Sequence, residues 1–325
     1  MENFKIIEFQ KQRDFSNKLN ATFAFITQNY KSFLKSIIYI AGPPVLVASL
    51  LLSSFIGDFF KLVLGAANNP EALQSYFLTV NFWAQVILMF IFLVVSYVAV
   101  IATTNNYMIL YAERQTNEID VTDVWTRVRD SLGMYFSTMA LFAVLAIAVY
   151  VLMIIPVVVL GAISPVLIFF GVMLLALGAL YLAISVSLVF AVRAFEKKGF
   201  FESIFRSFYL VNGKWWSTFG LMMILSILVS ILSYAFSLPA TILQGISMLH
   251  DGKSEMNSPM GVMGTIIFVL NSMAYITQLL LYFLLNIGLA FQYFNLVEMK
   301  ESKGLMSKIE TFGQPPLPPT QEEHY

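Results

Sequence analysis

Long apolar runs, separated by short polar segments, limit how this chain can fold more than any other feature. Six runs each contain about 20 or more predominantly apolar residues, the length that an α-helix needs to cross the hydrocarbon core of a bilayer. We therefore predict an all-α, polytopic membrane helical bundle. The six spans are placed near residues 33–55, 83–107, 134–160, 166–192, 216–236 and 262–291.

Composition favours the same class. Hydrophobic residues make up 58% of the chain and charged residues only 12%, whereas about a quarter of an ordinary soluble domain is charged. Residues 1–297 are therefore predicted to form one integral membrane domain within the lipid bilayer. Residues 298–325 have little apolar surface and are predicted to be a disordered, cytoplasmic, proline-rich tail. In this tail, residues 315–319 either form a polyproline helix that docks in an aromatic groove or have no partner.

The charges are balanced overall but unevenly placed. With 19 basic and 19 acidic residues, the net charge is zero, so no overall field attracts nucleic acid. However, 17 of the basic residues lie before the first span, after the sixth, or in the second and fourth connections. Only Lys61 and Lys253 lie on the other side. Because lysine and arginine concentrate in cytoplasmic loops, both termini are predicted to be cytoplasmic.

Residues 200–220 predict an amphipathic helix that leads into a span. Its apolar positions recur at helical spacing, and Glu202 and Arg206, four residues apart, can pair on the opposite side. A cation and two amphipathic rings of the kind found among lipid headgroups follow. The candidate interfacial residues are Phe201, Ile204, Phe205, Phe208, Lys214, Trp215 and Trp216. Such a helix either lies on the membrane or packs on the protein's own bundle, and both interpretations stay open.

An internal repeat includes this helix. With an offset of 80 residues, the apolar positions of residues 113–135 fall on those of residues 200–220. The matched pairs are Val121 with Phe201, Val124 with Ile204, Trp125 with Phe205, Val128 with Phe208, and Gly133 with Gly213. The amphipathic N-terminal segment matches more loosely. The pattern predicts three units, each an amphipathic helix followed by a pair of spans.

Prolines, glycines and polar residues predict the connections. Gly42-Pro43-Pro44 is expected to kink the first span, because each proline removes a backbone donor and clashes with the preceding turn. Residues 57–82 and 237–259 are predicted to be exterior loops. The short link at residues 161–165 predicts an antiparallel hairpin of the third and fourth spans.

The sixth apolar run contains a polar stripe. Asn271, Tyr275, Gln278, Tyr282 and Asn286 recur at spacings of three or four residues, which places them on one face of a single helix. Buried polar groups in lipid need partners, so this face meets either other helices or a wet cavity. The stripe is therefore a set of interhelical hydrogen bonds or a groove for a lipid headgroup or amphiphile.

Other chemistry has little support in the sequence. Apart from Lys35 at the start of the first, no charged residue lies within a proposed span, which counts against an ion-coupled pump. Cysteine is absent, and the only histidines are His250 and His324, so thiolate and histidine-rich metal sites cannot form. We find no phosphate-binding glycine loop, nucleophile elbow or zinc-protease motif. No catalytic residue, metal site or cofactor is predicted.

Two segments resemble known membrane proteins. The segment SIFRSFYLVNGKWWSTFGLMMIL, with Asn212-Gly213, Trp216 and Phe219-Gly220, resembles the membrane domain found with some glycerophosphodiester phosphodiesterases. The N-terminal segment RDFSNKLNATFAFITQNYKSFLKSIIYIAGP resembles uncharacterised membrane proteins of Bacteroidota. The resemblance implies a bacterial inner-membrane location and a bundle with interfacial helices. It implies no catalysis, because the phosphodiesterase reaction belongs to a separate soluble barrel.

These features predict a non-enzymatic inner-membrane protein that acts as an accessory or scaffolding subunit of a membrane complex. The alternative is a protein that binds or transports a lipid or amphiphile on the polar face of the sixth run. A membrane enzyme has the least support. The predicted partners are the bilayer and a membrane-protein complex, without nucleic acid, and the oligomeric state stays open.

Overall fold

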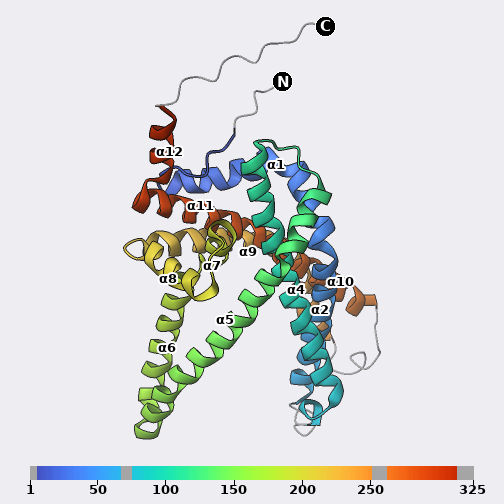
Figure 1. Ribbon diagram of the computed structural model, residues 1–325. Helices are drawn as coiled ribbons and strands as arrows, with labels where there is room; N and C mark the ends of the chain where they lie inside the picture. The colour runs from blue at the N-terminus through green and yellow to red at the C-terminus, as the bar shows by residue number, and fades with distance from the viewer. Residues whose placement is uncertain (1–5, 67–74, 251–261, 313–325) are drawn as a thin grey trace.

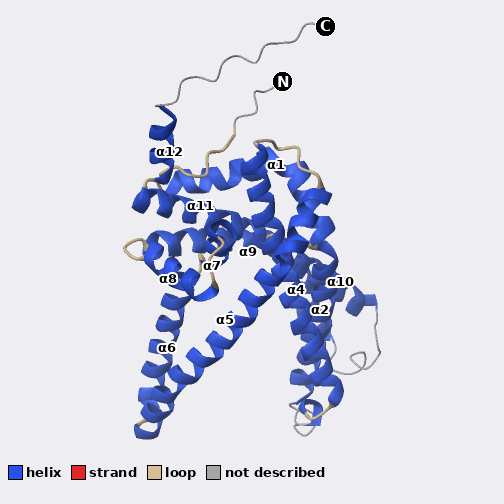
Figure 2. Ribbon diagram, viewed as in Figure 1, coloured by secondary structure: helices blue, strands red, loops and turns tan. Residues whose placement is uncertain are grey.

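The computed structural model describes residues 6–66, 75–250 and 262–312, and the regular structure in these residues is helical throughout (Figures 1 and 2). Six segments of the described chain are long and apolar enough to cross a membrane. They are Gly42–Phe60, Val80–Arg114, Val121–Ile163, Val166–Glu196, Trp215–Ile246 and Val262–Glu301. The predicted all-α membrane bundle of six spans is therefore confirmed.

Three helix pairs account for most of the length of the molecule. The first pair is α2 (Gly42–Ala66) with α4 (Val80–Arg114), and the second is α5 (Val121–Ile163) with α6 (Pro165–Ser185). The third is α9 (Trp215–His250) with α10 (Val262–Leu280), and it packs beside α2. Figure 1 shows that the α2–α4 and α5–α6 pairs extend to the same side and diverge from each other.

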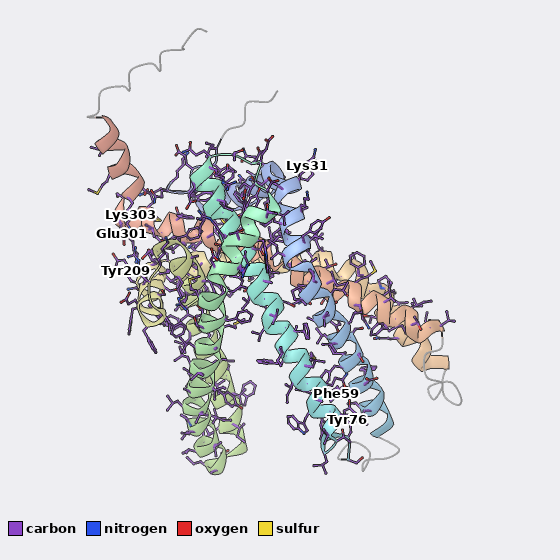
Figure 3. All side chains as sticks on the ribbon, turned by 45° about the vertical axis from the view of Figure 1, so that its right-hand side comes forward. Lys31, Phe59, Tyr76, Tyr209, Glu301 and Lys303 are labelled. Atoms are coloured by element: carbon purple, nitrogen blue, oxygen red, sulfur yellow. The ribbon has the colours of Figure 1, made fainter. Side chains whose placement is uncertain are left out.

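The remaining helices gather where the pairs meet. They are α1 (Phe15–Ile40), α7 (Val189–Glu196), α8 (Phe200–Val211) and α11 (Tyr282–Glu301), and α12 (Lys303–Phe312) follows them. We call α1, α7, α8, α11 and the adjoining ends of α4 and α5 the hub. Figure 3 shows Lys31, Glu301 and Lys303 at the hub end, whereas Phe59 and Tyr76 lie at the far tip of the α2–α4 pair.

Helix α11 is the centre of the hub. Every residue from Phe283 to Glu298 is buried, and α11 contacts α1, α4, α7, α8 and α9. A helix covered on all sides needs no polar face, which explains its weak amphipathicity. The N-terminal segment packs on it too, because the ring of Phe9 lies 5.1 Å from that of Phe294 and 5.6 Å from that of Phe291.

The first predicted span, residues 33–55, was wrong at its start. Helix α1 ends at Ile40 and a separate helix, α2, begins at Gly42. Pro43 and Pro44 therefore lie in the first turn of α2, where a missing N–H costs no hydrogen bond, and they start a helix instead of kinking one. Phe33 and Ile37 are buried in the hub at the end of α1.

The predicted loops were too long, and one amphipathic segment is continuous with the span that follows it. The helix α5 runs without interruption from Val121, so the amphipathic segment 113–135 and the span 134–160 share one helix. Gly133 does not end that helix. Helix α2 continues to Ala66 and α9 to His250, into the predicted loops 57–82 and 237–259. Within those loops, residues 67–74 and 251–261 lie outside the described residues.

The end of the chain also differs from the prediction. The predicted sixth span, residues 262–291, is two helices, because α10 ends at Leu280 and α11 begins at Tyr282. Residues 298–312, predicted to be disordered, are almost wholly helical. The Glu298 carboxylate accepts hydrogen bonds from the backbone N–H groups of Gly304 (2.7 Å) and Leu305 (3.1 Å), which ties α12 to α11. The proline-rich segment at residues 315–319 lies outside the described residues.

Candidate functional site

The predicted polar stripe is divided between two helices. Asn271, Tyr275 and Gln278 lie on α10, whereas Tyr282 and Asn286 lie on α11 beyond the break at Leu281. The single continuous helix on which the stripe was predicted is therefore interrupted, and the five side chains are divided between its two parts.

The members of the stripe have different surroundings. The Asn286 amide Nδ2 donates to Oδ1 of Asn105 on α4 at 3.1 Å, and both side chains are buried. The Tyr282 ring meets that of Tyr97 edge to face at 5.0 Å, and Gln278 is exposed. Asn286 thus makes the interhelical hydrogen bond that one interpretation of the stripe predicted.

The α8 helix divides its apolar residues between protein and exterior. Ile204 is 8% exposed and packs in a small cluster with Val189 and Phe200, and Phe208 is half-buried beside it. Phe201 and Phe205 face outward, with 64% and 73% of their surfaces exposed. The apolar positions of this helix are therefore divided between the protein and the exterior.

The residues after α8 also face two ways. Trp215 stacks on Phe219 at 5.3 Å and on Tyr181 at 6.0 Å. Trp216 is largely exposed, and so is Lys214. Phe201, Phe205 and Trp216 remain the candidates for contact with a bilayer interface.

Arg206 has partners other than the predicted Glu202. Its guanidinium Nε lies 3.0 Å from Oε1 of Glu196 at the end of α7, and Nη1 contacts Glu301 at the end of α11. The hydrogen bond to Glu301 is the main reason that the pKa of Arg206 is raised, followed by the opposing effect of burial and then the bond to Glu196. Figure 3 shows Tyr209 of α8 beside Glu301 and Lys303. These ion pairs fasten α7 and α8 to the central helix.

A cleft of about 1650 Å³ opens in the hub. Its walls are residues 6–10, the C-terminal turns of α4, the N-terminal turns of α5, α7 and the C-terminal part of α11. Apolar side chains such as Ile109, Met134 and Phe294 alternate with ionic and amide groups. The cleft can therefore hold a molecule that is apolar in one part and polar in another.

Most of the charges in the cleft are neutralised within it. The basic residues are Arg127, Arg193, Lys197, Lys198, Arg206 and Lys303, and the acidic residues are Glu8, Glu113, Asp130, Glu196 and Glu301. Arg127 pairs with Glu113, and Arg206 and Lys198 share Glu196. Lys303 lies 2.9 Å from Glu301.

Arg193 is the exception inside the hub. Its Nη1 donates to the backbone carbonyl of Met134 (3.3 Å) and to the Thr138 hydroxyl, both on α5. Its Nε is buried and has no hydrogen-bond partner. In the described chain, no carboxylate lies within ion-pairing distance of it. From the sequence, Arg193 was predicted only to be one of the basic residues of a cytoplasmic connection, because its hydrogen-bond partners on α5 are more than 50 positions away.

A buried cation lies outside the cleft. Lys18 of α1 is 2% exposed, and its Nζ donates to Gln292 Oε1 (2.7 Å) and Ser217 Oγ (2.8 Å). Burial lowers the pKa of Lys18 to about 8, with a further lowering by Lys214 and an opposing effect of Asp14. The burial of Lys18 could not be predicted from the sequence, because this residue lies in a segment with several exposed lysines.

The polar cluster at the end of the second predicted span lies in the hub core. Thr103, Thr104, Asn105 and Asn106 are all buried. Asn106 Nδ2 donates to Ser131 Oγ of α5 at 2.8 Å. Buried polar groups of this kind hold α4 against α5 and α11.

The fold and the cleft define a multi-pass helical membrane protein. In comparisons with known proteins, no family model, no curated protein and no solved structure matches this chain. The resemblance to the membrane domain of glycerophosphodiester phosphodiesterases therefore stays a prediction.

Proposed function

We propose that this membrane protein binds an amphiphile in the hub cleft and does not transform it chemically. The observation behind the proposal is the cleft itself, with its volume of about 1650 Å³ and its mixed apolar and polar walls. Ligand pockets commonly have volumes of about 300–1,000 Å³, so this one has room for a headgroup and part of an acyl chain.

The position of the cleft supports an amphiphile in particular. The cleft reaches Met134 and Tyr135 of α5, and beyond Thr138 no residue of α5 is buried. Val144, two turns further, is 65% exposed. A ligand in the cleft therefore lies next to the surface that faces lipid, and its tail can follow α5 into the bilayer.

We place the protein in a bacterial inner membrane with the hub and both termini on the cytoplasmic side. The support is the distribution of the basic residues, 17 of which lie in the terminal segments and connections on the hub side. A single cysteine introduced at Ser302, in a chain that has none, should react with a membrane-impermeant maleimide only after the cells are opened. Labelling of intact spheroplasts would show that Ser302 lies on the opposite side of the membrane and would contradict the proposed orientation.

The test of binding uses a phospholipid with a photoreactive group on its acyl chain. We expect crosslinks to Met134 or Phe294 in the cleft, and we expect Ala112→Trp, which fills the cleft wall, to abolish them. The matched control is Ala146→Trp on the exposed part of α5. Crosslinks confined to the outer surfaces of the spans, or unchanged in Ala112→Trp, would contradict the proposal.

A second candidate function is that of an accessory subunit of a membrane complex, and the exposed α5–α6 arm favours it. The arm comprises residues 139–183, in which Gly171 is the only buried residue among the side chains described. Leu152 and Leu174 are 68% and 70% exposed. If a partner binds here, replacing both leucines with alanine should remove a stoichiometric co-purifying protein that Ala112→Trp retains. Equal recovery from both variants would exclude the arm as its docking surface.

A further inference from the structure

We infer that Arg193 is the headgroup-binding residue of the cleft and that its ligand has an anionic headgroup of the phosphate type. The inference rests on the proposed function, because it names the ligand class of the same cleft. It goes further in assigning the recognition to one side chain.

Arg193 carries a positive charge that has no counterion in the described chain. Guanidinium groups stay protonated in proteins, and this one is half-buried with a buried Nε that lacks an acceptor. Its only described hydrogen bonds go to neutral oxygens, the Met134 carbonyl and the Thr138 hydroxyl. A charge that is partly withdrawn from water and has no counterion is stabilised by an anion nearby, so an anion that enters the cleft would interact favourably with Arg193.

The other cations of the cleft are less available to an external anion than Arg193. Arg127 and Arg206 already have carboxylate partners, and Lys197 is exposed on a turn with φ of 55°. Glu113, Glu196 and Glu301 are occupied by these pairs, and neither Asp130 nor Glu8 lies within ion-pairing distance of Arg193. Arg193 is therefore the cation best placed to accept an external anion.

The position of Arg193 also suits the headgroup of a lipid. Arg193 bonds to α5 at Met134 and Thr138, immediately before the exposed α5–α6 arm begins. An anionic group held here leaves an attached acyl chain free to run along the arm, which is the geometry of a phospholipid. A soluble phosphate ester shares the same headgroup chemistry, so the experiment must separate the two sources.

The experiment compares lipids that differ only in headgroup charge. Delipidated protein in detergent is titrated with phosphatidylglycerol, with phosphatidylcholine of the same chains, and with glycerol 3-phosphate, and bound ligand is counted by native mass spectrometry. We expect the wild type to favour phosphatidylglycerol over phosphatidylcholine by about tenfold, the size expected for one charge-assisted contact. Arg193→Gln should abolish the preference, and Arg193→Lys should keep part of it.

The matched control is Arg114→Gln, which removes the same charge from a paired arginine outside the cleft and should leave the preference intact. A preference that survives in Arg193→Gln would overturn the inference. If Arg193→Gln does not fold, the salt dependence of the wild type decides, since a preference that does not decline with ionic strength would also overturn it.

The remaining outcomes separate the inference from the proposed function. Tight binding of glycerol 3-phosphate alone would keep the anion site and assign it to a soluble ester. Cleft crosslinking that is indifferent to headgroup charge would overturn the role of Arg193 and leave amphiphile binding in place. Absence of cleft crosslinking and of any headgroup preference would overturn both.

Discussion

Lys18 of α1 and Gln292 of α11, 274 positions apart in the chain, are joined by a buried hydrogen bond of 2.7 Å from Nζ to Oε1. The Gln292 amide in turn donates to Thr218 Oγ1 of α9 at 2.9 Å. Among the described residues, the hydrogen-bond acceptors of this cation, at the meeting point of three helices, are therefore neutral side chains.

The Lys18 site should make stability depend on pH. The pKa of Lys18 is lowered from 10.5 to about 8, first by burial and then by Lys214. Between these two values the unfolded chain binds more protons than the folded one, so the free energy of unfolding rises as pH increases from about 8 to 10.5. Thermal unfolding midpoints in detergent, measured across this interval, should rise in the wild type. Lys18→Met should flatten that rise, and an equal slope in both proteins would show that another group is responsible.

Removing Arg206 should cost far more stability than removing an exposed arginine. The Arg206 side chain is 12% exposed and pairs with Glu196 and Glu301. Arg206→Met leaves these two carboxylates with only the more exposed Lys198 and Lys303 as ionic partners, and it should cost about 3 kcal/mol. The control is Arg114→Met, which breaks an exposed pair with Asp123 and should cost about 1 kcal/mol or less. Unfolding free energies in mixed micelles would measure both, and similar values for the two variants would contradict the structural role of Arg206.

Gly288 should not tolerate a methyl group. A Cβ at this position of α11 would clash with Cδ1 of Leu225 on α9, and Leu225 is fully buried. Gly288→Ala should therefore destabilise the protein by about 1–3 kcal/mol through overpacking. In the background of Leu225→Ala, adding Gly288→Ala should cost little or become favourable. Gly264→Ala, at a position with open space around it, serves as the neutral control.

Two neighbouring positions on α8 should respond differently to a charge. Phe205→Glu changes a residue that is 73% exposed and should leave folding intact while releasing this face from the membrane interface. Ile204→Glu places the same charge at a residue that is 8% exposed and should abolish folding.

The readout is the reactivity of a cysteine at Glu202, since the chain has no native cysteine. Its labelling by an aqueous maleimide should increase in Phe205→Glu. Unchanged labelling would mean that α8 does not touch the bilayer.

The helices themselves could be predicted because the signal for them is local. An apolar run of about 20 residues predicts a span whatever its neighbours are, and each of the six predicted runs overlaps one of the six segments long enough to cross a membrane. Helix breaks were harder to place. The prolines at residues 43 and 44 were correctly associated with a discontinuity, but whether they kink a helix or begin one depends on the burial of α1 against α11.

The candidate site was much less predictable. The polar stripe from Asn271 to Asn286 assumed a continuous helix, and the break at Leu281 removed its geometric basis. The pairing of Glu202 with Arg206 was reasonable from spacing, yet Glu196 and Glu301 hold the guanidinium instead. Nothing in the local sequence distinguishes Arg193, which lacks a carboxylate partner, from Arg206, which has two.

The sequence by itself determined that the chain is a helical membrane protein with six spans, because lipid leaves an apolar segment of that length no other way to satisfy its backbone. Only the tertiary structure decided which polar groups are buried together and where the cleft opens. The contacts between Lys18 and Gln292 and between Arg206 and Glu301 join residues 274 and 95 positions apart. Their partners are chosen by how the helices pack around α11, and no periodicity within one helix contains that information.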